Sequence, residues 1–527
     1  MTITAGTLRI LSLDGEKSQS LALFFFGFLS LHVLVWTALP LIFTHSLPVD
    51  TVEGVIWGQG WQLSYIHPPL QAWIIGATDS LVGYQRWAIY LLSQLLIAVG
   101  FLAVWLLARL IVTPNGAFVS VLSLEGVVFF NFMTPNLFPD LIVVPFWTLA
   151  TWSLYRALLY NRRLDWLLLG VWLAGAAYAK YVGAILALVM IGFILIEPQA
   201  RRCLQKAGPY LTAAVCLFLL SPHLWWIFTH NLPTVHRFAE SARRTDGIAE
   251  RFAALGGFTI SQLGLVALAA LLVIALRDAR HVTKSIVLAG TPTRFDRRFV
   301  AVFALAPIVV TWTLAALTGM WFRAHWSYAM WSFTGLFAVV FVVPSVSEGG
   351  LKRFLGAWVM TFGLVATAYA AANTLAPHLS GRPGAHLFAR NAKESAFPAE
   401  DLAEVLTRSW HAKVGTPIAY VIGSKWIAGH VSFFSPDHPL VVRNGTAADS
   451  PWIDIEDVNR RGALVVWNPE ADFKAYGTYP GWLSGSDPKQ LFPTMEVQPN
   501  IVLPWRTAAD LPPLSLAWGI IYPHEPH

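Results

Sequence analysis

The chain has 527 residues, of which 56% are hydrophobic and 13% are charged, whereas an ordinary soluble domain carries about 25% charged residues. Its mean hydropathy of +0.55 and its 24 Trp exclude a soluble or disordered protein, because Trp favours the boundary between water and lipid. Two Cys in the whole chain exclude a disulfide scaffold. The formal net charge is +6, and its placement along the chain is more informative than its sum.

Long apolar runs follow one another through residues 1–375. A membrane-spanning helix needs about 20 mostly apolar residues, and about eleven runs of this kind are present. They lie near residues 21–43, 86–112, 116–133, 139–159, 164–178, 181–197, 208–229, 256–276, 298–319, 325–345 and 354–374. The first run is too long for the apolar region of a cleaved signal peptide, so we expect it to be retained. The sequence therefore predicts a polytopic α-helical membrane protein with about eleven or more transmembrane helices.

The Lys and Arg residues indicate the orientation, because short cytoplasmic loops are enriched in them. With the N-terminus in the cytoplasm, the basic inner loops lie near residues 162–163, 201–206, 277–298 and 352–353. The first outer loop, 44–85, has no Lys or Arg, whereas the outer segment 230–255 is an exception with four Arg. Cations held against this bias indicate an anionic ligand. An odd number of spans then places the chain after about residue 376 on the outer face, in the periplasm of a Gram-negative source.

Residues 376–527 have a different texture, with more Pro, Asp and Glu and with apolar runs too short to cross a membrane. Pro398 and the sequence AEDLAEVLTRSW after it predict a helix with acidic residues in its first turn. Strands are predicted by β-branched runs bounded by Gly, Pro and Asn at 416–424, 439–445 and 462–469, with a helix-like segment between the first two. We therefore expect two domains, a transmembrane catalytic domain in 1–375 and a small soluble α/β domain in 376–527.

The strongest local signal for chemistry is the acidic pair in the first outer loop. Asp50 and Glu53 are three residues apart, which puts both carboxylates on one face if a helix begins there. The apolar stretch 70–82 is too short to span the membrane and contains Trp, which suits a helix in the interface. Two interpretations stay open for Asp50: it belongs to a shared carboxylate site, or it caps a helix and is solvated.

The loop also carries Tyr65 and the sequence His67-Pro68-Pro69-Leu70. With the acidic pair, the expected interfacial helix, the many spans and the outer C-terminal domain, this layout resembles the GT-C superfamily of polyprenyl-phosphate-sugar glycosyltransferases. Similar families are the lipid A aminoarabinose transferases, the protein O-mannosyltransferases and the bacterial transferases that modify lipid A or lipopolysaccharide core. The sequence starting at His67 is similar to the mannosyltransferase pattern.

The resemblance implies roles for the acidic residues. Asp50 matches the residue that these families use as catalytic base, with Glu53 and Asp140 as further catalytic carboxylates. Thr51 follows Asp50, so the contiguous Asp-Glu pair frequent in these families is absent, as is the Glu-Lys-Pro of aminoarabinose transferases. Asp140 follows Pro139 at the expected outer start of a span, where it either holds the acceptor or a metal, or only favours the positive end of a helix.

The same resemblance implies binding residues for the donor and the acceptor. The expected donor-phosphate ligands are Lys180, Arg243, Arg244, Arg323 and His325, and the expected substrate-binding residues are Tyr65, His67 and Trp326. Other interpretations stay open here too, because a Lys at a span end often reaches toward lipid head groups, and the Arg-rich segment also suits general contact with lipid phosphates. The segment around Trp326 also fits an aromatic belt at the membrane surface.

The implied activity is inverting transfer of a sugar from a polyprenyl-phosphate donor to a hydroxyl group of a glycolipid, such as lipid A or lipopolysaccharide core, or of a protein. Glu53 and His67 are weak candidates for a divalent metal site, but no metal-binding spacing is present, so no obligatory cofactor is expected. Membrane lipids are expected partners and nucleic acid is not. The alternative is a lipid or solute transporter or flippase, against which there is no inverted repeat and only one acid, Glu125, well inside a span.

Overall fold

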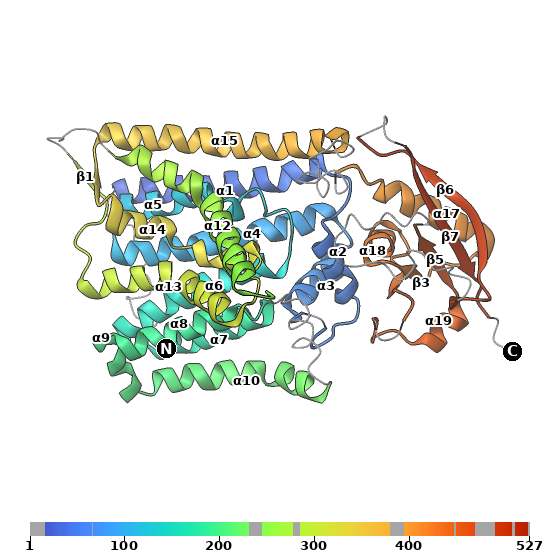
Figure 1. Ribbon diagram of the computed structural model, residues 1–527, viewed down its shortest axis with the longest axis horizontal. Coiled ribbons are helices and arrows are strands. Elements are labelled where there is room, and N and C mark those ends of the chain that lie inside the picture. Colours follow the sequence, from blue (N-terminus) through green and yellow to red (C-terminus); the bar gives the residue numbers. More distant parts are fainter. Residues whose placement is uncertain are drawn as a thin grey trace.

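The computed structural model describes residues 16–65, 67–230, 245–277, 285–379, 395–446, 449–468, 491–507 and 512–524. Figure 1 shows a helical part and a C-terminal part that follow each other along the long axis. Two short helices, α2 (Val49–Gly58) and α3 (Leu70–Val82), lie between them. The stretch 70–82, expected as a helix too short to span the membrane, is therefore confirmed as a helix.

Long apolar helices build the helical part, and several of them run along the long axis (Figure 1). Among the described residues, seven helices are long and apolar enough to cross a membrane, or up to eight if a pair bent by 92° counts as one span. The protein is therefore a polytopic helical membrane protein. The α-helices of this part, the short ones included, are α1 (Glu16–Phe43), α4 (Arg86–Ile111), α5 (Pro114–Leu122), α6 (Pro139–Tyr160), α7 (Arg163–Ala179), α8 (Gly183–Ile196), α9 (Pro198–Arg201), α10 (Gly208–Thr229), α12 (Ile248–Leu276), α13 (Arg294–Thr318), α14 (Thr334–Phe337) and α15 (Glu348–Leu379).

Two runs expected to be single spans are broken. Residues 116–133 contain α5 and two short 3-10 segments, and residues 325–345 contain a 3-10 segment, α14 and one π turn. Backbone of this kind is tolerated at membrane depth where other protein segments bury it. A Cβ on Gly335 would lie 1.9 Å from the Ser120 carbonyl oxygen, so the two broken runs pack backbone against backbone. The expected count of about eleven spans stays a prediction.

Glu125, the acid noted well inside a span, lies in the first of these broken runs and is fully buried. Its Oε1 is 2.5 Å from His32 Nδ1, and the Asn131 amide donates to its backbone carbonyl at 2.6 Å. A buried polar group is tolerated when it has hydrogen-bonding partners. These contacts therefore account for the burial of Glu125 between α1 and the broken run.

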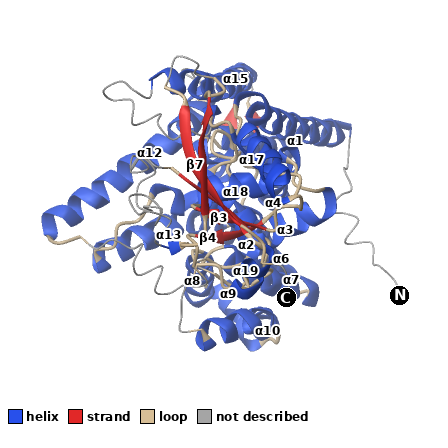
Figure 2. Cartoon of the chain, turned by 90° about the vertical axis from the view of Figure 1, so that its right-hand side faces the viewer, coloured by secondary structure: helices blue, strands red, loops and turns tan. Residues whose placement is uncertain are grey.

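The C-terminal part contains a five-stranded mixed sheet with the order β4-β3-β5-β7-β6. Strand β3 is parallel to β4 and β5, whereas β7 is antiparallel to β5 and β6. Figure 2 shows these strands across the end of the helical part. The bounds are α17 (Ala399–Val414), β3 (Tyr420–Gly423), α18 (Lys425–Phe434), β4 (Leu440–Arg443), α19 (Ile455–Arg461), β5 (Ala463–Trp467), β6 (Glu496–Leu503) and β7 (Leu514–Ile521). The helical part adds a short antiparallel pair of strands that are distant in the chain, β1 (Ile286–Val287) and β2 (Ser345–Val346).

Helix α18 packs closely on α2 and joins the two parts. A Cβ on Gly429 would lie 2.3 Å from a methyl group of Val52, so only a glycine lets the two helices approach to this distance. The side-chain amide of Gln59 donates to Ser432 Oγ at 2.8 Å, and its oxygen accepts from the backbone of β4 at 3.1 Å. The position of α2 therefore depends on the C-terminal part.

We predict that Gly429→Ala destabilises the protein by about 1–3 kcal/mol, because the added methyl group overpacks this contact. The apparent melting temperature of the full-length protein in detergent measures the effect. Gly356→Ala is the matched control, since it is also in a helix and a Cβ there meets nothing within 4 Å. Equal melting temperatures for the two variants would contradict the close contact between α18 and α2.

His430 gives the same contact a pH dependence. The backbone N–H of Leu47 donates to His430 Nε2 at 3.1 Å, and burial lowers the pKa of the imidazole to about 4. The unfolded chain binds a proton near the ordinary pKa of about 6.5, so stability falls as the pH drops from 6.5 toward 4 and is constant above that window.

We expect the free energy of unfolding to fall by about 2 kcal/mol when the pH is lowered from 7.5 to 5, because of the His430 imidazole. Melting temperatures at both pH values test this, with His430→Gln as the comparison, because glutamine is polar but does not titrate. The wild-type protein should lose more stability on acidification than the variant. Equal losses would show that His430 does not titrate across the folding transition.

Candidate active site

Gln71 at the start of α3 joins the segments that surround Asp50. Its Nε2 donates to the Asp50 carbonyl oxygen at 2.7 Å and to the Leu137 carbonyl oxygen at 2.9 Å. Its Oε1 accepts from the Tyr65 hydroxyl at 3.2 Å. The side chain is 1% exposed, and buried polar groups of this kind hold a structure in one arrangement when they are satisfied. Gln71 therefore fixes α2, α3 and the segment before α6 relative to one another.

Asp50 lies in the first turn of α2 and is half-buried. Its Oδ2 accepts from the Asn136 side-chain amide at 3.2 Å, and Asn136 Oδ1 accepts from Thr51 Oγ1 at 3.2 Å. The N-cap of α2 is Pro48, so Asp50 lies inside the helix and not at its cap. The helix that a shared face of the acidic pair requires is present, and a neutral amide orients the Asp50 carboxylate.

Glu53 lies one turn further along α2 and has a different environment. It is 6% exposed, its Oε2 accepts from Lys425 Nζ at 3.1 Å, and its Oε1 is 3.7 Å from Arg443 Nη1. Burial raises the pKa of Glu53, but Lys425 and His67 and then Arg443 outweigh this effect and hold it below its ordinary value. Glu53 is therefore ionised and paired with cations from the C-terminal part.

Tyr65 and His67 lie beside this pair of carboxylates. The Tyr65 ring stacks on Trp57 with centroids 4.3 Å apart, and burial raises its pKa well above the ordinary value, so the hydroxyl stays protonated. Burial lowers the pKa of His67, while Glu53 opposes the effect and Lys180 adds to it. The charges of Glu53, Asp50 and Lys180 thus all act on the His67 imidazole. Because its pKa is lowered, this imidazole is neutral at pH 7.

Asp140 and Lys180 form a buried ion pair. Asp140 is in the first turn of α6 and 3% exposed, and its Oδ2 is 2.5 Å from Lys180 Nζ. Lys180 follows α7 and also lies over the Trp326 ring, with Nζ 5.5 Å from the centroid. Asp140 Oδ1 has no hydrogen-bonding partner among the described residues. The two residues predicted separately from the sequence are therefore direct partners.

The remaining predicted residues differ in their exposure and in their electrostatic contact with this pair. His325 is half-buried and within electrostatic reach of Asp140, Lys180 and Asp50. Arg323 is exposed at the start of the same 3-10 segment. Arg243 and Arg244 lie outside the described residues.

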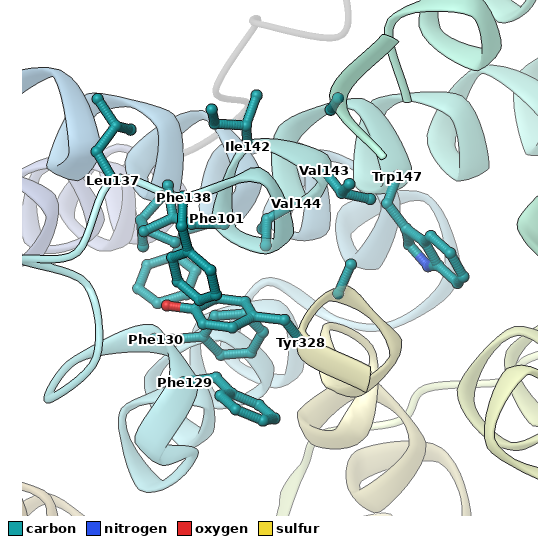
Figure 3. Close-up of a cluster of buried hydrophobic side chains, with 14 of the residues drawn as sticks. Phe101, Phe129, Phe130, Leu137, Phe138, Ile142, Val143, Val144, Trp147 and Tyr328 are labelled. Atoms are coloured by element: carbon teal, nitrogen blue, oxygen red, sulfur yellow. The ribbon is translucent and has the colours of Figure 1, made fainter. Parts of the chain in front are cut away.

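An aromatic cluster supports the 131–138 segment and the start of α6 from within the helical part. Figure 3 shows Tyr328 among Phe129, Phe130 and Phe138, with Leu137 nearby. The Tyr328 ring stacks on Phe129 at 4.6 Å and meets the Phe138 ring edge-on at 5.5 Å. Aromatic pairs of this geometry add about 0.5–1.5 kcal/mol each beyond their buried area. Their packing fixes the backbone that carries Asn136 and Asp140.

Sequence reasoning missed four residues of this arrangement: Gln71, Asn136, Lys425 and Arg443. Gln71 directly follows the sequence His67-Pro68-Pro69-Leu70, and Asn136 lies in the Pro-rich sequence TPNLFPD. Both were therefore detectable as polar residues close to predicted site residues. Lys425 and Arg443 carried no signal, since their partner Glu53 is 372 residues away from Lys425 in the chain. That no metal is obligatory stays a prediction. In the part of the chain that the structure describes, no three His, Cys, Asp or Glu side chains gather at a metal-binding distance.

Comparisons with known proteins agree with the fold. The crystal structure of ArnT from Cupriavidus metallidurans in the apo state superposes with a TM-score of 0.59 at 15% identity, covering 97% of this chain and 100% of that one. The model of the dolichyl-phosphate-mannose-protein mannosyltransferase family matches residues 66–226, a range that holds Asp140 and Lys180. Together with the relative described next, these matches support a membrane glycosyltransferase of the GT-C superfamily.

Among characterised proteins, the chain is similar to the lipopolysaccharide core galacturonosyltransferase RgtB of Rhizobium johnstonii. The two are 23% identical over 453 residues, which cover 84% of this chain and 86% of that protein. The aligned stretch is longer than the helical part, so the similarity extends into the C-terminal part. The transporter alternative is not favoured.

We predict that Lys180→Met destabilises the protein by about 3 kcal/mol, because it leaves the Asp140 carboxylate buried without its cation. The melting temperature in detergent measures this loss, and Lys206→Met, at an exposed position, is the control. The double variant Asp140→Asn with Lys180→Met should recover part of the stability. A single variant as stable as the control would contradict a buried ion pair.

Proposed function

We propose that this protein is an inverting glycosyltransferase that moves a sugar from a polyprenyl-phosphate donor to a hydroxyl group of a glycolipid. The observation that carries the proposal is the oriented, half-buried Asp50 carboxylate, whose charge acts on the same histidine as that of Lys180. A carboxylate and an ammonium group whose charges act on one imidazole suit a reaction in which a proton is removed and an anion leaves.

Asp50 is the general base in this mechanism. An acceptor hydroxyl becomes a strong nucleophile as its proton passes to a positioned carboxylate. Its oxygen then bonds to the anomeric carbon of the sugar while the bond from that carbon to the phosphate oxygen breaks. The electron pair of the broken bond leaves with the polyprenyl phosphate, and the single displacement inverts the anomeric centre. The bond from Asn136 aims the carboxylate, which has about four lone-pair sites in all.

Lys180 stabilises the leaving phosphate. Negative charge grows on that phosphate as the sugar departs, so a preorganised cation is worth most there. An ammonium group has three N–H donors, and Asp140 accepts from one of them. Arg323 is a further proposed cation for this phosphate and His325 a proposed hydrogen-bonding ligand, and Arg243 and Arg244 stay proposed ligands of the same phosphate. Tyr65, His67 and Trp326 border the sugar.

The setting in the cell follows from the donor. Its polyprenyl chain must stay in hydrocarbon while its head group reaches the site, which requires a membrane enzyme. We propose the bacterial inner membrane, with the N-terminus in the cytoplasm and the site and the C-terminal part in the periplasm. The name of RgtB supports a lipopolysaccharide core or lipid A acceptor. No obligatory metal is proposed, because Glu53, one of the two weak candidate ligands, is already paired with two cations.

We predict that Asp50→Asn and Asp50→Ala lower the rate of transfer by about 10² to 10⁴-fold, the usual contribution of a general base. The assay uses purified full-length protein, extracted membrane glycolipids and polyprenyl-phosphate donors that carry aminoarabinose, mannose or galacturonic acid. Transfer by the wild-type protein should persist in excess chelator.

Glu404→Gln serves as the control, because it removes an exposed carboxylate of α17 far from the site in sequence. Donor binding by the Asp50 variants, measured separately, should be retained. Wild-type rates in both Asp50 variants would rule out Asp50 as the base, and transport of lipid without transfer from any donor would overturn the proposed function.

A further inference from the structure

Two cations of the C-terminal part reach into the catalytic loop of the helical part. Lys425 is the first residue of α18, and Arg443 is the last residue of β4. Their side chains are 17% and 12% exposed, and both approach the carboxylate of Glu53, at 3.1 Å and 3.7 Å. A buried carboxylate between two cations is ionised and held in one orientation, provided that both cations stay in place.

Arg443 has further contacts that fix its own position. Its Nη2 is 2.7 Å from Asp449 Oδ1, and its backbone N–H donates to Ser450 Oγ at 2.8 Å. The guanidinium also lies over the Trp57 ring at 5.5 Å. Because Trp57 stacks on Tyr65, Arg443 is in contact with the aromatic side of the site as well as with Glu53.

We infer that Lys425 and Arg443 are positioning residues of the active site, through which the C-terminal part holds Glu53 and completes the catalytic loop. This inference rests on the proposed function. Glu53 is in turn within electrostatic reach of Asp50 and His67. The contact between the two parts is therefore a condition for catalysis and not only for stability. Glu53 supplies a fixed negative charge beside the base, while Asp50 takes the proton.

The pH dependence of catalysis reports this role. The groups that face Glu53 are Lys425 and Arg443 from the C-terminal part, His67 from the loop and Asp50 from α2. Burial raises the pKa of Glu53 and Lys425 is the strongest opposing influence. Removing Lys425 therefore raises the pKa of Glu53, and the acidic limb of the rate profile moves to higher pH.

The test uses full-length protein and the donor that gives transfer in the assay above. Lys425→Met should lower kcat by about 10- to 100-fold, as expected for a displaced neighbour of the reacting groups, with little change in the donor KM. The acidic limb of its kcat profile should move to higher pH, and Lys425→Arg should restore most of the activity. Lys413→Met, at an exposed position of α17, should match the wild-type protein.

A double-mutant cycle separates action through Glu53 from a general structural role. In the Glu53→Gln background, Lys425→Met should add no further loss of kcat, because the charge that Lys425 holds is already gone. Additive losses, or wild-type kcat and pH profile in Lys425→Met, would overturn the inference. The melting temperatures of the four proteins of the cycle, the wild type, the two single variants and the double variant, test the contact between Lys425 and Glu53 independently of enzyme activity.

Sugar transfer and the melting temperatures together distinguish a failure of the inference from a failure of the proposed function. If the wild-type protein transfers no sugar from any donor, the proposed function fails, and the catalytic part of the inference fails with it. Coupled melting temperatures would then still support the contact between Lys425 and Glu53. If transfer occurs and the four melting temperatures are additive, the inference alone is overturned.

Discussion

The buried amide of Gln71 is the constraint on which the arrangement of the site depends. It is satisfied by two backbone carbonyl groups and one hydroxyl from three different segments, and a buried amide without these partners would cost about 1–3 kcal/mol for each group left unpaired. Because these three partners come from separate segments, the one amide fixes α2 relative to α3 and to residues 131–138. The direction of the Asp50 carboxylate follows from that position.

Burial also explains why the charged residues of the site occur in pairs. Glu53 and Asp140 are both almost fully buried, and an isolated carboxylate in such a place costs several kcal/mol. Each is compensated by a cation from a distant segment, Lys425 in one case and Lys180 in the other. The helical part and the C-terminal part therefore fold around shared charges, and neither carboxylate is acceptable without its partner segment.

The sequence alone predicted the local features of the fold and few of its long-range contacts. The helix at 70–82 and three strands of the C-terminal part follow from the length of an apolar stretch and from β-branched runs, which are local signals. Strand β6 was missed because Pro499 and an irregular register near it interrupt the alternation of an edge strand. The breaks in 116–133 and 325–345 were missed because hydropathy measures composition and not helical continuity. The pairing of Asp140 with Lys180 needed the packing of α6 on α7.

Asp50 and Glu53 are one helical turn apart, yet their environments assign them different chemistry. Asp50 is half-buried, and the neutral amide of Asn136 fixes the direction of its carboxylate. Glu53 is buried against two cations that stabilise its ionised form, and such a carboxylate is a poor proton acceptor. Different environments for neighbouring carboxylates commonly separate their roles in catalysis. The residue spacing made the pair a candidate site, and in the proposed mechanism the C-terminal part decides which member takes the proton.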